Sequence, residues 1–225
     1  MLSLVLLSTL AVPGADPTPF PEDLQRAACR ATVRVTGAQL GSGVAVARRG
    51  EFAFVLTAGH VTAGAKKLQI VSGAGGEPSP LAAELLATWP DLDLALLRTE
   101  ATEKRLPALP LAGAGAKLPA PAGAVFAAGF GDGEAPAGEM NRLLGKRLLR
   151  RPGGVSAFVW EVETPPRAGQ SGGPLVDATG KVIGVCLGTQ DGKGYYCHLD
   201  EICTALKRRG YAWVWQGVPE QQTQK

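Results

Sequence analysis

Hydrophobic and polar positions alternate along most of the chain after Ala31, in short runs separated by turn residues. The segment ATVRVTG sets Val33 and Val35 between polar residues, and the runs SGVAVA and FAFVLTA are apolar, β-branched and aromatic. Runs of the same kind follow in KLQIVSG, LAAELLATW, DLDLALLRT, AVFAAGFG, MNRLLGKRLLR, SAFVWEVET, PLVDATGKVIGVCLG and GYYCHL. Many short strands in close succession are typical of a β-sandwich or a β-barrel.

These strand runs fall into two halves, joined by the stretch PALPLAGAGAKLPAPAG, which has no hydrophobic period. Two similar strand-rich halves favour a pair of barrels. Short helices are expected in DLQRAACR, before the first strand, and in EICTALKRR, after the last strand. Asp200 is the expected N-cap of the second helix, and Gly210 the residue that ends it. The expected fold class is therefore all-β with a short C-terminal helix.

Composition and charge narrow the function classes. The chain has 225 residues with 45% hydrophobic content, which is enough to bury a sizeable core. Its formal net charge is +3, so no large basic field points to nucleic acid. The basic pairs are short and scattered, as in Arg48-Arg49 and Lys66-Lys67, and we interpret them as solvated loop or helix-end charge.

The N-terminus carries a different signal. The run MLSLVLLSTLAV is apolar and uncharged, too short to span a bilayer as a helix but of the right length for a secretory signal. We therefore expect a signal peptide over residues 1–15, a linker over 16–24, and a secreted or periplasmic protein without stable membrane insertion once the signal is removed. The alternative is an N-terminal segment that packs onto the domain.

Four cysteines form no CxxC pair and no metal-ligand spacing, so no metal site is expected. Cys186 and Cys197 lie on two apolar runs on either side of Gln190-Asp191-Gly192-Lys193. In a hairpin centred there they would lie opposite each other and close enough for a disulfide, which would leave Cys29 to pair with Cys203. Buried thiols are an equally good reading.

Two polar residues stand where apolar strands begin or end. His60, in LTAGHVTAG, ends an apolar strand, a place where side chains can converge on a cleft. Asp93, in DLDLALLRT, opens another, and burying its carboxylate is costly unless a group such as an imidazole N–H donates to it. Asp91 is the competing acid, but it follows Pro90 in an expected turn.

Ser171 lies in the glycine-rich stretch RAGQSGGPLV. A serine hydroxyl becomes a nucleophile when a base accepts its proton and an acid orients that base. Gly169 can adopt a positive φ and turn its N–H inward beside the N–H of Ser171, so these two residues are the expected oxyanion donors. The competing reading of the serine alone is an ordinary glycine-rich turn.

The order His60, Asp93, Ser171 is that of the chymotrypsin arrangement and differs from the order in subtilisin-like and α/β-hydrolase enzymes. The first two residues belong to one half of the chain and the serine to the other. A site built from them would lie in the crevice between the halves, where catalytic clefts often form.

Three segments of the chain resemble the catalytic blocks of trypsin-like serine peptidases. They are TAGHV around His60, DLALL from Asp93 and GQSGGPLV around Ser171, while GSGVAVA and GKVIGV are most similar to the HtrA/Deg-type bacterial branch. That branch usually has Asn where this chain has Gln170. The resemblance covers about residues 25–210 and implies two six-stranded antiparallel β-barrels of the chymotrypsin type packed across a cleft.

The implied domain covers residues 25–212, with one barrel over about 25–115 and the other over 116–212, followed by a tail over 213–225. HtrA-type proteins usually carry PDZ domains after the peptidase. Here YAWVWQGVPEQQTQK follows Gly210, so neither a PDZ domain nor regulation through one is expected.

The resemblance also implies a primary specificity pocket. One wall would be formed by Pro165, Pro166 and Arg167. Pro165 stands at the position where specificity for Arg or Lys would need an Asp. The remaining residues implied in the pocket are Cys186, Leu187, Gly188, Thr189, Tyr196 and His198. We expect it to take an apolar or small side chain, although Arg167 or His198 could attract an acidic one.

The function that these residues predict is a serine endopeptidase that hydrolyses peptide bonds through an acyl-enzyme intermediate. His60 would act as general base, Asp93 would orient it, and Ser171 would attack. The partner is a polypeptide substrate, and neither a metal nor an organic cofactor is expected. The alternative is an inactive or latent peptidase-fold protein that binds peptides, which the intact triad disfavours. An esterase on another fold is disfavoured by the residue order.

Overall fold

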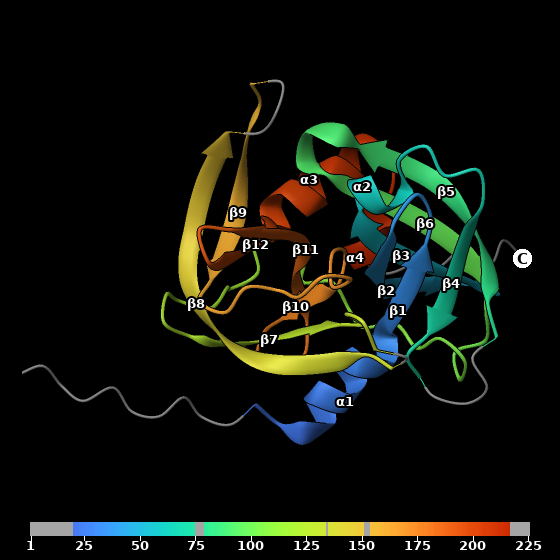
Figure 1. The fold of residues 1–225 in the computed structure, drawn as a ribbon, viewed down its shortest axis with the longest axis horizontal. Coiled ribbons are helices and arrows are strands. Elements are labelled where there is room, and N and C mark those ends of the chain that lie inside the picture. The colour runs from blue at the N-terminus through green and yellow to red at the C-terminus, as the bar shows by residue number, and fades with distance from the viewer. Residues whose placement is uncertain (1–19, 75–78, 134, 151–153, 217–225) are drawn as a thin grey trace, which may run out of the picture.

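The computed structural model describes residues 20–74, 79–133, 135–150 and 154–216. Within them the strands form two closed antiparallel barrels of six strands each, which lie side by side (Figure 1). The predicted architecture is confirmed. Each barrel closes its own sheet, which leaves no unpaired sheet edge.

The first barrel has the strand order β1-β2-β3-β6-β5-β4. Its strands are β1 (Thr32–Thr36), β2 (Leu40–Arg49), β3 (Phe52–Ala58), β4 (Leu68–Ser72), β5 (Leu81–Trp89) and β6 (Leu94–Glu100). The second barrel has the order β10-β11-β12-β9-β8-β7. Its strands are β7 (Ala124–Gly129), β8 (Ala137–Arg150), β9 (Ser156–Val162), β10 (Pro174–Val176), β11 (Val182–Gln190) and β12 (Lys193–His198).

The position of β3 explains why its sequence is almost continuously apolar. Val55 packs in the core of the first barrel together with Val33 and Val35. Phe54 and Leu56, on the opposite face of the strand, belong to a larger core that includes residues of the second barrel. A strand that is buried on both faces has no position for an exposed polar side chain.

The long connection between the barrels is fastened to both. Leu109 N–H donates to the carbonyl of Ala45 on β2 at 2.8 Å. The next residues of the connection bond β11, because Val182 N–H donates to the carbonyl of Pro110 at 2.9 Å and Ala112 N–H donates to the carbonyl of Val182 at 2.9 Å. The Pro/Gly/Ala-rich stretch is therefore an ordered connection that is hydrogen-bonded to both barrels.

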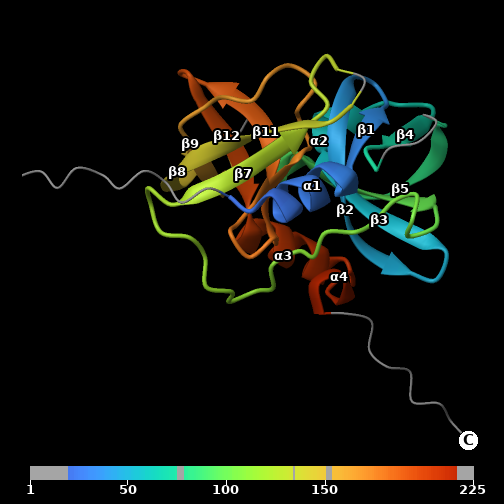
Figure 2. The ribbon, with the colours of Figure 1, turned by 90° about the horizontal axis from the view of Figure 1, so that it is seen from below.

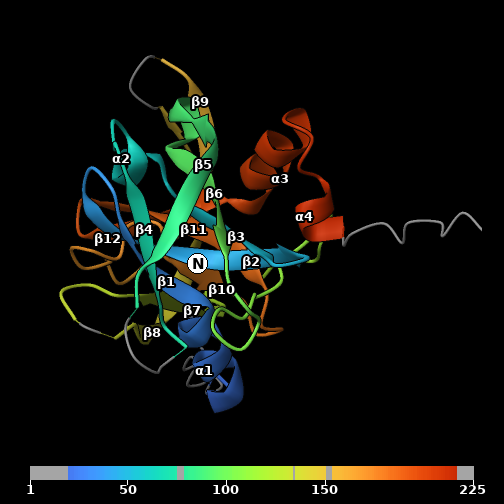
Figure 3. The same cartoon turned by 90° about the vertical axis from the view of Figure 1, so that its right-hand side faces the viewer.

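Short helices close the ends of the fold. They are α1 (Glu22–Ala31), α2 (Gly59–Thr62), the 3₁₀ turn η1 (Pro90–Leu92), α3 (Leu199–Arg208) and α4 (Trp213–Gln216). Viewed from below, α1 crosses the junction of the barrels, where it contacts β1, β2, β7 and β8 (Figure 2). The view onto the first barrel shows α3 and α4 together on one side of it (Figure 3).

The expected cap of α3 is wrong by two residues. The N-cap is His198, whose Nδ1 accepts the N–H of Asp200 at 3.1 Å, so Asp200 lies in the first turn. Histidine fills the role because it carries an acceptor at the distance that a serine or aspartate cap would supply. Gly210, at φ +80°, follows the helix as predicted.

Both predicted ends of the domain need adjustment. Residues 22–24, expected in a linker, are the first residues of α1. Residues 213–216, expected in a tail, form α4, where Val214 is buried and the Trp213 ring packs edge-on against Phe54 at 4.6 Å. The expected signal peptide and residues 217–225 lie outside the described residues. Among the helices that are described, none is long and apolar enough to cross a membrane.

The four cysteines are thiols in this structure, so neither expected disulfide is present. The hairpin turn lies where it was predicted, with Gln190 opposite Lys193. A bulge between Cys186 and Gly188 then shifts the register by one residue, which places Cys186 opposite Tyr196 and Cys197 opposite Val185. Neighbouring residues of a strand face opposite sides of the sheet, so the two thiols point apart.

Candidate active site

His60 and Asp93 are joined by two hydrogen bonds at one end of the first barrel. Asp93 Oδ2 lies 2.8 Å from His60 Nδ1, and its Oδ1 accepts the backbone N–H of His60 at 2.7 Å. The side chains are 33% and 22% exposed, respectively, so the pair is partly shielded from water. A carboxylate on Nδ1 fixes the ring's orientation and keeps the proton on that nitrogen.

Local backbone geometry makes this contact possible. Gly59 N–H donates to the carbonyl of Asp93 at 2.9 Å, and a Cβ atom on Gly59 would lie 3.1 Å from Asp93 Oδ1. Asp93 itself is left-handed, at φ 53°, a conformation that Asp tolerates better than most residues. Asp91, the competing acid, is exposed within η1.

The loop that carries Ser171 is pressed against the same barrel end. Ser42 N–H donates to the carbonyl of Ser171 at 2.7 Å, and Gly172 N–H donates to the carbonyl of Cys186 at 2.8 Å. Gly172 has φ +89°, and a Cβ atom there would lie 2.1 Å from the Ser42 carbonyl oxygen and 2.8 Å from Ala58 N. Only glycine permits this approach. It brings the residue that follows Ser171 against Ala58, which lies two positions before His60.

The turn before Ser171 has the geometry of a type II turn. Gln170 N–H donates to the carbonyl of Arg167 at 3.1 Å, and Gly169, the third residue of the turn, has φ +82°. The side chain of Gln170 supports the same turn, since its Oε1 accepts the N–H of Arg167 at 2.8 Å. Within the described residues, the N–H groups of Gly169 and Ser171 donate to no protein acceptor.

Comparison with known proteins gives this arrangement a family. Residues 41–185, more than half of the chain, match the model of the trypsin-like peptidase domain. The chain belongs to the trypsin-like peptidase family. Serine protease Rv3671c of Mycobacterium tuberculosis is 32% identical over 141 residues, which are 60% of this chain and 33% of that protein. The chain thus spans about a third of the length of the curated relatives it matches.

Solved structures show the same fold. The active form of the Rv3671c protease from M. tuberculosis superposes with a TM-score of 0.71 at 23% identity, covering 93% of this chain and 95% of that one. The serine endoprotease from Yersinia pestis superposes with a TM-score of 0.67 at 20% identity, covering 90% of this chain and 69% of that one.

Several residues expected to line a specificity pocket of this trypsin-like domain lie at the surface beside the Ser171 turn. Pro165, Arg167 and Thr189 are exposed, while Leu187 and Gly188 are half-buried. Pro166 is half-buried, and its Cδ would lie 2.9 Å from a Cβ atom on Gly194. Arg167 also faces Glu139 at 3.8 Å, so its charge has an acidic neighbour.

Two further expected pocket residues are buried on strands of the second barrel. Cys186 and Tyr196 are buried and share a side-chain hydrogen bond. Burial raises the pKa of the Cys186 thiol to about 12, so it stays protonated at neutral pH. Asp93 contributes to the same upward shift in pKa, which places Cys186 within electrostatic range of the Asp93 carboxylate.

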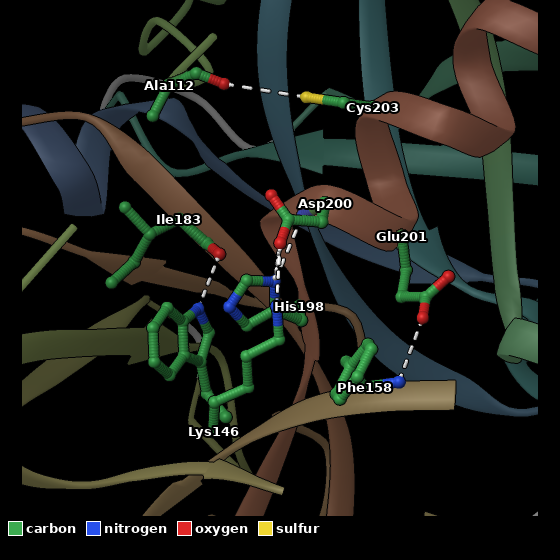
Figure 4. Close-up of polar contacts among 9 residues, drawn as sticks. Ala112, Lys146, Phe158, Ile183, His198, Asp200, Glu201 and Cys203 are labelled. Atoms are coloured by element: carbon green, nitrogen blue, oxygen red, sulfur yellow. Dashed lines mark hydrogen bonds and ion pairs between the residues drawn. The ribbon is translucent and has the colours of Figure 1, made fainter. Parts of the chain in front are cut away.

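His198 does not line an open pocket, contrary to expectation. Its side chain is 1% exposed and packs against Trp160 with ring centroids 4.2 Å apart. Figure 4 shows it at the start of α3, beside Asp200 and Lys146, whose own ion pair measures 2.7 Å. Burial, and next the positive charge of Lys146, lower the pKa of His198 to about 4, while Asp200 opposes this shift.

A pocket of about 400 Å³ opens beside the His60 and Asp93 pair. It is lined by α2, by Leu85 and Thr88 of β5, and by Pro90 of η1. In the described part of the chain, no group of three or more His, Cys, Asp or Glu side chains is arranged to hold a metal ion.

Proposed function

We propose that the protein is a serine endopeptidase in which Ser171, His60 and Asp93 form the catalytic triad. The observation that carries this proposal is the pair of hydrogen bonds from Asp93 to His60, at 2.8 Å and 2.7 Å, on the barrel end against which the Ser171 loop packs. A purely structural hydrogen-bonded pair would not need a partly exposed imidazole beside a glycine-rich serine loop.

The carboxylate of Asp93 sets the chemistry of the base. Because Oδ2 holds the proton on Nδ1, the lone pair of His60 is on Nε2, the form that can accept a proton. His60 takes the proton of Ser171 Oγ as that oxygen attacks the peptide carbonyl. The resulting imidazolium is stabilised by Asp93, and His60 then gives the proton to the leaving amine.

The oxyanion of the tetrahedral intermediate binds to the N–H groups of Gly169 and Ser171. Support comes from the type II turn and from the absence, among the described residues, of a protein acceptor for either N–H. Removing one such donor costs about 3–4 kcal/mol of transition-state stabilisation in another serine peptidase. Water, activated by His60, then hydrolyses the acyl group from Ser171.

The pocket beside the Ser171 turn takes an apolar or small side chain of the substrate. Pro165 supplies no carboxylate there, and the Pro166 ring packs close to Gly194. Profiling on a peptide library tests this assignment. Cleavage after Leu, Val or Ala is expected, and a preference for cleavage after Arg or Lys would contradict it.

Labelling with a fluorophosphonate, which reacts with activated serines, tests the function itself. We expect covalent labelling of the wild type, none of Ser171→Ala and none of His60→Ala. Asp91→Asn is the matched control, because Asp91 is an exposed acid two residues from Asp93, and it should label like the wild type. A folded wild type that neither labels nor cleaves peptides, yet binds them, would favour the peptide-binding alternative.

Export through an N-terminal signal is a separate part of the proposal, supported by the apolar run at residues 1–12 and the small residues Gly14 and Ala15. Expression of the chain in a bacterium followed by mass spectrometry of the periplasmic fraction tests it. A mature form that begins near residue 16 is expected. Retention of the intact N-terminus in the cytoplasm would contradict export.

A further inference from the structure

Ser42 lies on β2 of the first barrel, yet its polar atoms bond the loop of the second barrel that carries Ser171. The residue is fully buried. Its N–H donates to the carbonyl of Ser171 at 2.7 Å, and its hydroxyl donates to the carbonyl of Gly169 at 2.7 Å. Ser42 therefore holds both residues that we assign as oxyanion donors, Gly169 and Ser171. Gly169 is 127 positions away from it in the sequence.

The remaining hydrogen-bonding capacity of Ser42 is also used. Its Oγ accepts the N–H of Phe130 at 2.9 Å, and Phe130 directly precedes Gly131, against which Gly169 packs. Its carbonyl accepts Thr57 Oγ1 at 2.6 Å, which fixes the strand at this point. The hydroxyl donates one bond and accepts another, so its orientation is set.

These bonds act on the turn through one peptide group. The peptide between Gly169 and Gln170 is held at both ends, because its carbonyl accepts Ser42 Oγ and its N–H donates to Arg167. A peptide group is planar, so fixing both ends fixes its plane. The positive φ of Gly169 then sets the direction of the Gly169 N–H. In a type I turn the preceding peptide would be flipped and this N–H would point away.

We propose that Ser42 is a positioning residue for catalysis, whose hydroxyl keeps the oxyanion turn in its type II form. The proposal rests on the proposed peptidase function and deepens it. Ser42 acts through Gly169 and touches no reacting atom. Its loss should therefore weaken binding of the transition state far more than binding of the substrate.

Three substitutions separate the hydroxyl from the shape of the side chain. Ser42→Ala removes the hydroxyl, while Ser42→Thr and Ser42→Val have nearly the same shape and differ in the hydroxyl alone. Ser72→Ala is the matched control, because Ser72 also donates to a backbone carbonyl, that of Arg105 at 2.5 Å, but away from the site. Thermal unfolding of each variant identifies those that are folded.

The expected result is a drop in kcat of about 10- to 100-fold for Ser42→Ala and Ser42→Val, with KM changed less than about threefold. Ser42→Thr should recover most of the lost kcat, and Ser72→Ala should match the wild type. The Ki of a peptide aldehyde, which forms a tetrahedral adduct with the serine, should rise in parallel with the loss of kcat/KM.

The inference is overturned if whichever of Ser42→Ala and Ser42→Val is folded keeps wild-type kcat, loses activity through KM alone, or binds the aldehyde as tightly as the wild type. It is also overturned if Ser42→Thr, when folded, is no more active than Ser42→Val. Failure of the peptidase function itself looks different, because the wild type would then show no cleavage and no fluorophosphonate labelling in the same assays.

Discussion

Gly169 lies so close to Gly131 that a Cβ atom on Gly169 would stand 2.4 Å from the Gly131 carbonyl oxygen. The same residue has φ +82°, a conformation that costs L side chains about 1–2 kcal/mol. Backbone geometry and space thus both require glycine at the position that we assign to the oxyanion donor. Because two separate constraints act on Gly169, we expect the turn to tolerate no larger residue at this position.

Gly169→Ala should abolish most of the activity and destabilise the fold. Gly210→Ala is the matched control, because Gly210 has φ +80° but a Cβ atom there would meet nothing within 4 Å. The control should lose about 1–2 kcal/mol of unfolding free energy and keep its activity. We expect Gly169→Ala to lose more stability than the control and at least about 100-fold in kcat. Equal kcat for the two variants would contradict the oxyanion assignment.

The barrels could be predicted because their signals are local. Strand periodicity and turn residues can be recognised within segments of about ten residues, so each strand is predicted from its own segment alone. The turn at Asp191-Gly192 was placed correctly for the same reason. The bulge after Cys186, by contrast, depends on how β11 packs, and it moved Cys186 from opposite Cys197 to opposite Tyr196.

The residues of the candidate site also differ in whether the local sequence reveals them. His60 and Asp93 stand out in sequence because each is a titratable residue beside an apolar strand. Ser42 reads as one more small residue in the apolar run SGVAVA, and its role arises from contacts more than 80 positions away. The one local signal was a hydroxyl residue in a strand that is otherwise apolar. His198 was misplaced because the sequence around it does not show that its ring packs against Trp160 of another strand, at the start of α3.

Asp93→Asn should retain the fold and lose about ten-thousandfold in kcat, the size of effect known for this change in a Ser-His-Asp site. The backbone N–H of His60 requires an acceptor, so the amide oxygen of Asn would take the place of Oδ1. Its NH₂ group would then face Nδ1 and hold the proton on Nε2, which leaves His60 unable to accept the proton of Ser171. Steady-state kinetics with Asp91→Asn as control measure this. A loss of less than about tenfold would show that Asp93 does not set the tautomer.

Thiol titration should find four reactive cysteines in denaturant without any reductant, because all four are thiols in the structure. In the native protein, Cys29 should react first, since it is half-buried whereas Cys186, Cys197 and Cys203 are buried. Burial also raises the pKa of Cys186 and of Cys203 to about 12, so their thiolate fractions are small. Two titratable thiols, rising to four after reduction, would instead indicate a disulfide.

The stability of the protein should fall as the pH drops from about 6.5 to 4, through His198. Its pKa is lowered from 6.5 to about 4 by burial and by the charge of Lys146. Above pH 6.5 the residue is neutral in both the folded and the unfolded chain and contributes no pH dependence. Below pH 6.5 the unfolded chain binds a proton that the folded chain does not, so unfolding becomes more favourable by up to about 1.4 kcal/mol per pH unit.

His198→Asn isolates this effect, because Asn does not titrate and its side-chain oxygen can still accept the N–H of Asp200 at the start of α3. Urea unfolding of both proteins at several pH values between 4 and 7 gives the difference in their unfolding free energies. Groups far from residue 198 are common to both chains, so their contributions cancel in that difference. The unfolding free energy of the wild type, taken relative to that of His198→Asn, should fall steadily as the pH drops below 6.5. A difference that does not change with pH would mean that His198 becomes protonated as readily in the fold as in the unfolded chain, despite its burial beside Trp160.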